Sequence, residues 1–267
     1  MNRKIIFLDC DGTLFDVPRG MLKASDKTRY AIKELIKNGH LVFIASGRSK
    51  CILPKDIVSL EPSGFITANG ACAYTKDEII FRTDIKNYSV DAVVRYCNEH
   101  NGVYYLETQD YIATRDINDQ LHKKFVNTWG VDKTVFKSNK VCNDKYQLMM
   151  AAFDNKEDFE GFAQEMSTIV DVRKQYGFDS YDVSDFGLDK GDGVREVLKY
   201  YGIDKKDAYA FGDGINDIEM LEEVEESYAM ANARPEVLKI AKHIALDVLK
   251  DGFYEAMVKE GLIKSIE

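Results

Sequence analysis

Short apolar runs recur along the chain where buried strands of a parallel sheet would be expected. Two clear examples are residues 4–8 and 41–45, which are rich in side chains that favour β-structure. Between them, Ser25 can cap a helix with apolar residues at helical spacing, and this helix ends at Gly39. A strand, a helix and a second strand in this order predict a parallel pair joined by a right-handed crossover.

The pattern changes after about residue 80 and returns near residue 186. In between, short strand-like runs mix with helical apolar spacings, which predicts an α+β unit with an antiparallel sheet. Beyond it the strand–helix alternation resumes, with a strand expected at 208–211. We therefore expect an α/β core domain, residues 1–82 and 186–267, interrupted by an α+β domain, residues 83–185.

Acidic residues follow the first of these strands. Asp9 and Asp11 stand one residue apart at its end, and Gly12 then allows a sharp turn. The carboxyl ends of parallel strands are where α/β sheets bind ligands, and two carboxylates so close together are hard to keep ionised. The pair therefore indicates a divalent cation, an acid/base pair or both. An ordinary turn with an Asx bend would explain the same residues without a ligand.

A second acidic group comes from the far half of the chain. Asp213, Asn216 and Asp217 follow the strand expected at 208–211, and glycines flank them. These residues and Asp9 would stand at strand ends in both halves of the interrupted domain. This convergence favours a metal site over a set of unrelated turns.

Two further groups could hold an anion. Ser46 and Gly47 end the second strand, where a hydroxyl and a backbone amide can donate together. Lys190 falls in the first turn of a predicted helix, where the helix dipole disfavours a lysine. It is either a solvated surface residue or a cation that points at a bound anion. A third strand ends in the turn Asn69-Gly70, to which we assign no chemistry.

Other reactive residue types give no comparable signal. Cys10 stands between the two aspartates, but strand alternation places it opposite them, so we expect a small buried residue. The four histidines show no metal-ligand spacing, and we expect each at the surface or in a loop.

Composition narrows the classes of partner. The 267 residues are 45% apolar and 30% charged, as in ordinary globular proteins, and their net charge of −9 disfavours nucleic acid and anionic membranes. No apolar run approaches the length of a membrane span, and no signal-like segment precedes the first strand. We therefore expect a cytoplasmic protein without a membrane partner. The sequence carries no signal for an oligomeric state.

Four segments in this order resemble the motifs of the haloacid dehalogenase-like phosphatases, most closely the Cof-type hydrolases with a class IIB cap. The matching segments are Asp9-x-Asp11-Gly12-Thr13-Leu14, Ser46-Gly47-Arg48, Lys190-Gly191 and residues 212–217, and residues 69–71 and 229–233 also look like Cof-type segments. The resemblance covers essentially the whole chain. It implies a Rossmann-like parallel-sheet core interrupted by an α+β cap. It is loosest in the cap, which leaves the substrate open.

The resemblance also implies residue roles. Asp9 would be the nucleophile that forms an aspartyl-phosphate, and Asp11 the general acid and base. Mg²⁺ would be held by Asp9, the backbone carbonyl of Asp11 and Asp213, with Asp217 as a further ligand or an orienting group. Oxygen ligands without His or Cys suit Mg²⁺ better than Zn²⁺. The groups that would hold the phosphoryl oxygens are Ser46, Gly47, Lys190 and Asn216.

The implied function is that of a Mg²⁺-dependent phosphoric monoester hydrolase. Its substrate would be a small phosphorylated metabolite, such as a sugar phosphate or a phosphorylated cofactor. A phosphomutase, which returns the phosphoryl group of the same phospho-aspartate to a sugar, stays open. A non-enzymatic phospho-acceptor module also combines an acidic cluster with a lysine and a hydroxyl. The long insert and Asp11 argue against this last alternative.

Overall fold

The computed structural model describes residues 2–138, 145–175 and 179–266. Its larger sheet contains β1 (Ile5–Asp9), β2 (Leu41–Ala45), β3 (Gly64–Thr67), β4 (Cys72–Tyr74), β5 (Ile79–Arg82), β12 (Ala208–Gly212), β13 (Glu226–Ala229) and β14 (His243–Ile244). The strand order is β14-β13-β12-β1-β2-β3-β4-β5. The strands from β14 to β3 are parallel, while β4 and β5 add an antiparallel edge. The α/β class expected from the sequence is confirmed.

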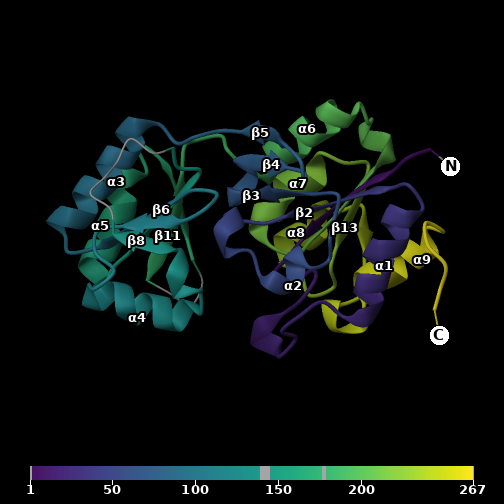
Figure 1. Ribbon diagram of the computed structural model, residues 1–267, viewed down its shortest axis with the longest axis horizontal. Coiled ribbons are helices and arrows are strands. Elements are labelled where there is room, and N and C mark those ends of the chain that lie inside the picture. The colour runs from purple at the N-terminus through teal and green to yellow at the C-terminus, as the bar shows by residue number, and fades with distance from the viewer. Residues whose placement is uncertain (1, 139–144, 176–178, 267) are drawn as a thin grey trace. The chain divides into compact units, whose positions relative to one another are not determined.

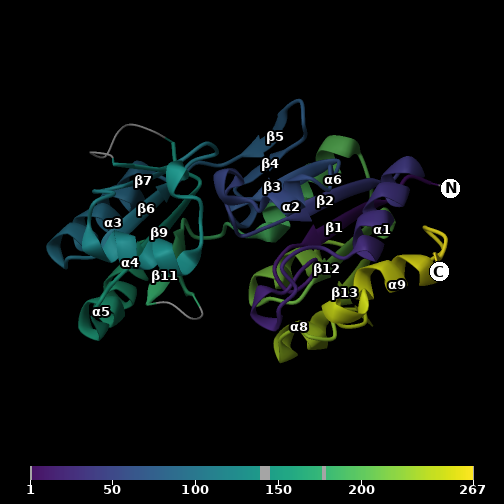
Figure 2. The ribbon, with the colours of Figure 1, turned by 60° about the horizontal axis from the view of Figure 1, so that its bottom comes forward.

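Helices cover both faces of this sheet (Figures 1 and 2). They are α1 (Asp26–Lys37), α2 (Lys55–Val58), α6 (Lys190–Tyr201), α7 (Ile218–Glu222), α8 (Pro235–Ile240) and α9 (Gly252–Lys259). Alternation along β1 explains the two layers, because Ile6 and Leu8 pack on the side of α1 and α9 whereas Ile5 and Phe7 pack on the side of α6 and α7. All four side chains are sealed from solvent. Each contributes about 1.5–3 kcal/mol by burial, which makes β1 the centre of the core.

The order in which successive strands are added to the sheet reverses at β1. From β1 the chain proceeds to β2 and β3 on one side, and its later half adds β12, β13 and β14 on the other. Ile5 therefore pairs with both Leu41 and Ala208. Open α/β sheets bind ligands at such a switch point, outside the carboxyl ends of the strands. Asp9 is the last residue of β1 and stands at this place.

Local signals explain where the helices flanking β1 and β12 begin. Ser25 caps α1 as expected, because its hydroxyl accepts a hydrogen bond from the backbone N–H of Thr28 at 3.1 Å. Asp189 caps α6 and forms a reciprocal pair of hydrogen bonds with Asp192. This capping box fixes Lys190 as the first residue of α6.

A second compact unit is formed by Thr83–Leu188 together with the short segment Ser49–Ile52, whereas the expected insert was 83–185. Its six-stranded sheet has the order β10-β11-β9-β6-β7-β8. The strands are β6 (Val103–Glu107), β7 (Ile112–Thr114), β8 (Phe136–Ser138), β9 (Leu148–Ala152), β10 (Asp171–Lys174) and β11 (Ser180–Ser184), and the helices are α3 (Asn87–Glu99), α4 (Gln120–Trp129) and α5 (Lys156–Met166). The sheet is antiparallel apart from the parallel pair β7–β8.

One of the histidines differs from expectation, because His122 lies within α4 and is only 5% exposed, so it is neither at the surface nor in a loop. His40 lies in the loop between α1 and β2, as expected, although it is only 4% exposed. The Nδ1 atom of His40 accepts a hydrogen bond from the backbone N–H of Lys4 at 3.1 Å, which gives the buried ring a polar partner. Cys10 is buried, as predicted. None of the helices in the described residues has the length and apolar character needed to cross a membrane.

Candidate active site

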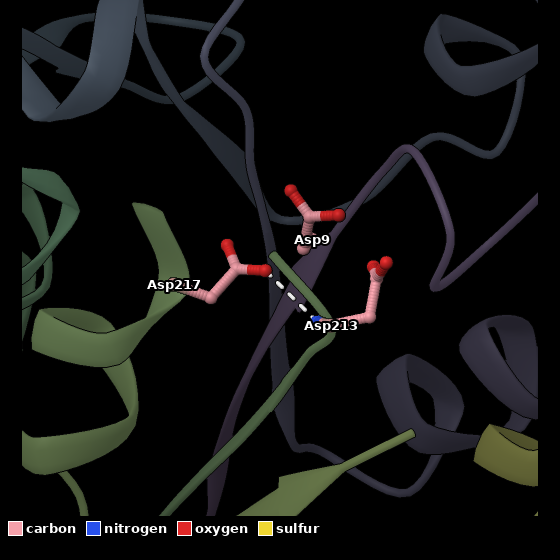
Figure 3. Close-up of side chains that lie close together, drawn as sticks. All are labelled: Asp9, Asp213 and Asp217. Carbon is pink, nitrogen blue, oxygen red and sulfur yellow. Dashed lines mark hydrogen bonds between the residues drawn. The ribbon is translucent and has the colours of Figure 1, made fainter. Parts of the chain in front are cut away.

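Three carboxylates from two strand ends converge at the switch point (Figure 3). Asp9 ends β1, Asp213 directly follows β12, and Asp217 lies in the short 3₁₀ helix Ile215–Asp217. One oxygen of each lies within 4.8 Å of the others. Asp9 and Asp217 are 6% and 1% exposed, so little water screens the negative charges. The structure thus brings together residues that are more than 200 positions apart in the sequence.

Lys190 supplies the positive charge of this cluster. Its Nζ atom donates to Oδ1 of Asp9 at 2.5 Å and to Oδ1 of Asp217 at 2.6 Å. The side chain is sealed from solvent, so the interpretation of Lys190 as a solvated surface lysine is wrong. Burial alone would lower the pKa of Lys190, but the two carboxylates outweigh burial and raise the pKa above its ordinary value. The ammonium charge is therefore retained.

One ammonium does not balance three carboxylates. Burial, followed by the charge of Asp217, raises the pKa of Asp9 well above its ordinary value, although Lys190 partly opposes this shift. Burial and the same neighbour raise the pKa of Asp213 to about 7. The protein alone therefore stabilises the fully ionised cluster poorly. A cation with a preference for oxygen ligands would supply the missing charge, so the donor set fits a divalent metal such as Mg²⁺.

Asp217 is fixed by several contacts. Its Oδ2 atom accepts hydrogen bonds from the backbone N–H groups of Asp213 at 2.9 Å and Gly214 at 2.8 Å, while Oδ1 binds Lys190. Both oxygens are engaged in holding the loop after β12 and the ammonium group. Of the two roles expected for Asp217, this arrangement favours that of an orienting group.

Asp213 is held against the turn that follows β1. The hydroxyl of Thr13 donates to its Oδ1 atom at 3.1 Å. Gly12 has a φ of +93°, and a Cβ atom there would lie 2.1 Å from the Asp213 carboxylate, so this position requires glycine for its conformation and for the close approach. Asn232 donates to the carbonyl oxygen of Gly12 at 2.8 Å. Neither Thr13 nor Asn232 had an expected role in the site.

Asp11 lies apart from the three clustered carboxylates. Its side chain is half exposed, and its two oxygens accept hydrogen bonds from Nε and Nη2 of Arg48 at 3.1 Å and 3.0 Å. A bidentate contact of this kind fixes both the position and the plane of the carboxylate. The sequence placed Arg48 in a motif but gave it no role. A cation at the end of the strand next to β1 was the signal that could have found it.

Three of the expected anion-binding groups meet near the end of β2, where Ser46 and Gly47 lie close to Asn216 from the loop after β12. Ser46 is buried after β2, and its Oγ atom accepts a hydrogen bond from the backbone N–H of Arg48 at 3.2 Å. Gly47 lies close to Asn216, because a Cβ atom on Gly47 would be 3.6 Å from the Asn216 side-chain nitrogen. That nitrogen donates to the side-chain oxygen of Asn69 at 3.2 Å. The structure therefore brings Ser46, Gly47 and Asn216 together.

A pocket of about 470 Å³ opens beside Asp11 and Asp213 and could admit part of a small molecule. Its other lining residues are Gly12, Asp16, Val17, Pro18, Arg19, Asn232 and Arg234. Cys10 is no competing nucleophile, because burial raises the pKa of its thiol far above the ordinary value. The reactive groups near this pocket are therefore carboxylates.

Comparison with known proteins extends over nearly the whole chain. The sequence model of a family described as haloacid dehalogenase-like hydrolase matches residues 6–257. A protein of Bacillus subtilis (strain 168) named "Putative phosphatase YkrA" is 29% identical, with 99% of this chain and 100% of that protein aligned. A hypothetical protein from Geobacillus kaustophilus HTA426 has a crystal structure that is 26% identical, with a TM-score of 0.87 over 98% of this chain and 100% of that one. A sugar phosphatase of HAD subclass IIB is also 26% identical, with a TM-score of 0.81 over 97% of this chain and 100% of that one.

Proposed function

The chain belongs to the haloacid dehalogenase-like hydrolases, and we propose that it is a Mg²⁺-dependent cytoplasmic phosphatase that hydrolyses small phosphorylated metabolites through an aspartyl-phosphate. The observation that carries this proposal is the contact between Asp9 and Lys190 inside the carboxylate cluster. This contact supports a role for Asp9 as the nucleophile that receives the phosphoryl group, beside an ammonium that can bind the phosphoryl oxygens. The similarity to a sugar phosphatase favours sugar phosphates among the possible substrates.

Asp9 is suited to nucleophilic attack by its position and its contacts. Lys190 holds one of its oxygens, and the other accepts no hydrogen bond from the described residues. This second oxygen attacks phosphorus, and the bond between phosphorus and the ester oxygen breaks to leave an aspartyl-phosphate. Water then attacks the phosphorus atom and releases inorganic phosphate and the Asp9 carboxylate.

Asp11 acts as the general acid in the first step and as the general base in the second. It protonates the departing ester oxygen and then takes a proton from the attacking water. Its exposed side chain beside the pocket can reach a leaving group that the buried Asp9 cannot. Arg48 holds the Asp11 side chain in place while the substrate is absent.

The metal would be held by the carboxylates of Asp9 and Asp213 and by the backbone carbonyl of Asp11, with Asp217 orienting the loop. When bound, it would offset the repulsion between the carboxylates and the phosphoryl group and stabilise charge on the equatorial oxygens. The phosphoryl oxygens are bound by Ser46, Gly47, Lys190 and Asn216. We assign the second unit, Thr83–Leu188, the role of a cap that selects the substrate.

Phosphate release tests this proposal. The purified protein is incubated with sugar phosphates, nucleotides, pyridoxal phosphate and flavin mononucleotide, in Mg²⁺ and in EDTA. We expect release that requires Mg²⁺ and that favours some esters over others. Asp9→Asn should lower kcat by at least about 1,000-fold while the circular dichroism spectrum stays unchanged, because the amide is a poor nucleophile.

The phosphomutase alternative predicts a different product in the same assay. Conversion of a hexose 1-phosphate to the 6-phosphate without free phosphate would contradict hydrolysis. Full activity in EDTA would contradict the assigned metal, and substantial turnover by Asp9→Asn would contradict the assigned nucleophile. A phospho-acceptor module would instead accumulate a long-lived aspartyl-phosphate.

A further inference from the structure

The turn after β3 has an unusual backbone. Ala68, Asn69 and Gly70 follow one another with φ angles of 54°, 50° and 98°. Most residues other than glycine avoid this left-handed region, because the Cβ atom approaches the following carbonyl oxygen, and asparagine enters it more readily than most. A strained backbone of this kind persists where the surrounding structure holds it and is often found at functional sites. The turn therefore requires strong support from its neighbours.

The support comes from the segments that carry the anion-binding groups. The backbone N–H of Ala68 donates to the carbonyl oxygen of Arg48 at 2.9 Å, and that of Asn69 donates to the carbonyl oxygen of Ser46 at 3.3 Å. On its other side, Gly70 packs against Asp189, whose carbonyl oxygen would lie 1.9 Å from a Cβ atom on Gly70. The turn thus joins the loop after β2 to the residue that precedes Lys190.

The side chain of Asn69 completes the connection. It is only 6% exposed, and its Oδ1 atom accepts the hydrogen bond from Nδ2 of Asn216. The same oxygen would lie 2.9 Å from a Cβ atom on Gly47, so it also packs directly on the loop after β2. Within the described part of the chain, the Asn69 side-chain nitrogen donates no hydrogen bond. A single side chain therefore sits between Gly47 and Asn216.

Backbone conformation alone does not require an asparagine at this position. Glycine would adopt a φ of 50° with less strain than any residue that has a Cβ atom. The feature that asparagine adds is a short amide side chain, and its oxygen is engaged with Asn216. The chemical reason for Asn69 therefore lies in the position of its side chain.

We propose that Asn69 is a positioning residue of the phosphate site, which fixes the Asn216 amide and the Ser46-Gly47 loop in register with Lys190. The inference rests on the proposed function, because it assumes that a phosphoryl group binds these donors. Asn69 acts through Asn216 and the loop and takes no part in proton or phosphoryl transfer. It is distinct from the residues to which the sequence motifs assign phosphate contacts.

Asn69→Gly is the informative variant, because it removes the amide and keeps a residue suited to the backbone. Asn101→Gly is the matched control, since Asn101 has a φ of 51° and is exposed in the second unit after α3. Both variants make the same chemical change at residues with nearly the same φ angle. We expect both to unfold cooperatively in urea, with midpoints at or near that of the wild type.

Calorimetric titration with inorganic phosphate in Mg²⁺ measures the effect. We expect Asn69→Gly and Asn216→Ala each to weaken phosphate binding about tenfold, since a hydrogen bond to an anion is misplaced or lost. Asn101→Gly should bind as the wild type does. In the double variant, Asn69→Gly should add no further loss to Asn216→Ala, because residues that act together are not additive.

Each outcome decides the proposal. Binding by Asn69→Gly within twofold of the wild type would overturn it, and so would a double variant whose loss is the product of the two single losses. A wild type that binds phosphate but hydrolyses no ester would contradict the phosphatase function alone, and the variants would still test Asn69. A wild type that does not bind phosphate would overturn both proposals.

Discussion

Replacing Lys190 by methionine should destabilise the fold as well as impair catalysis. Methionine has a similar length but no charge, so Asp9 and Asp217 would face each other in a buried site without their shared partner. At an effective dielectric constant of 20, each contact at 2.5–2.6 Å corresponds to about 6–7 kcal/mol of Coulomb attraction. Desolvation of the three ions offsets most of the sum.

The net loss depends on what remains after the substitution. Removal of one partner from a buried ionic group costs about 3–5 kcal/mol, because the remaining charges stay buried and unpaired. We therefore expect the free energy of unfolding of Lys190→Met, measured in urea with EDTA, to fall by about 3–5 kcal/mol. Millimolar Mg²⁺ should recover part of the loss, because it would bind the same carboxylates.

A matched control separates the site from a general effect of losing a lysine. Lys206 is a surface residue paired with Asp204, and Lys206→Met should leave the unfolding curve unchanged. If Lys190→Met unfolds at the same urea concentration as the wild type in EDTA, the carboxylates do not depend on Lys190 and the electrostatic reasoning fails. An equal loss with and without Mg²⁺ would contradict the assignment of the cluster as a metal site.

Two further predictions follow from Arg48 and His40. Arg48→Lys removes the planar guanidinium group that binds both oxygens of Asp11. The value of kcat/KM should therefore fall about tenfold for an alkyl phosphate and less for p-nitrophenyl phosphate, whose leaving group needs little protonation. Equal losses for both esters would argue against this role of Arg48. Burial lowers the pKa of His40 below its ordinary value of 6.5. As the pH falls below 6.5, the unfolded chain takes up a proton at this histidine that the folded chain resists. The contribution of His40 to the free energy of unfolding is therefore present above pH 6.5 and is lost as the pH falls. The difference in unfolding free energy between the wild type and His40→Asn, measured in urea, should therefore become smaller from pH 7.5 to pH 5.5. A constant difference would refute the lowered pKa of His40.

The hydrophobic pattern and the strand ends accounted for most of the first unit. Asp9 and Asp213 could be placed at one edge of the sheet because parallel strands put their carboxyl ends together. Strands β7 and β8 were not predicted, because each has only three residues, which is too few to show the alternation of apolar and polar residues typical of a strand. Sequence spacing reveals which residues follow strands, but it does not reveal which side chains meet across them.

The partners of individual polar groups depended on the tertiary structure. Lys190 could be interpreted as a surface residue because a lysine in a first helical turn is ordinarily solvated, and its burial is set by residues 181 positions earlier and 27 later in the chain. Arg48 and Asn69 gained their roles in the same way, from contacts with Asp11 and Asn216. The burial of His40 was not foreseen, because a histidine in the loop after a helix gives no sign that a backbone N–H will face its ring.

The central position of β1 has a consequence for synthesis of the chain on the ribosome. One edge of β1 can pair with β2 early, whereas the other pairs with β12, whose first residue is Ala208. At a translation rate of about 5–20 residues per second, β12 is synthesised roughly 10–40 s after β1, so this second edge of β1 is unpaired for that time. During that interval an apolar strand has exposed hydrogen-bonding groups and is a target for other chains. The continuous segment Thr83–Leu188 is made in between and can pack its own sheet first. Asp9, the proposed nucleophile, is therefore the earliest part of the site to be synthesised and among the last to be buried.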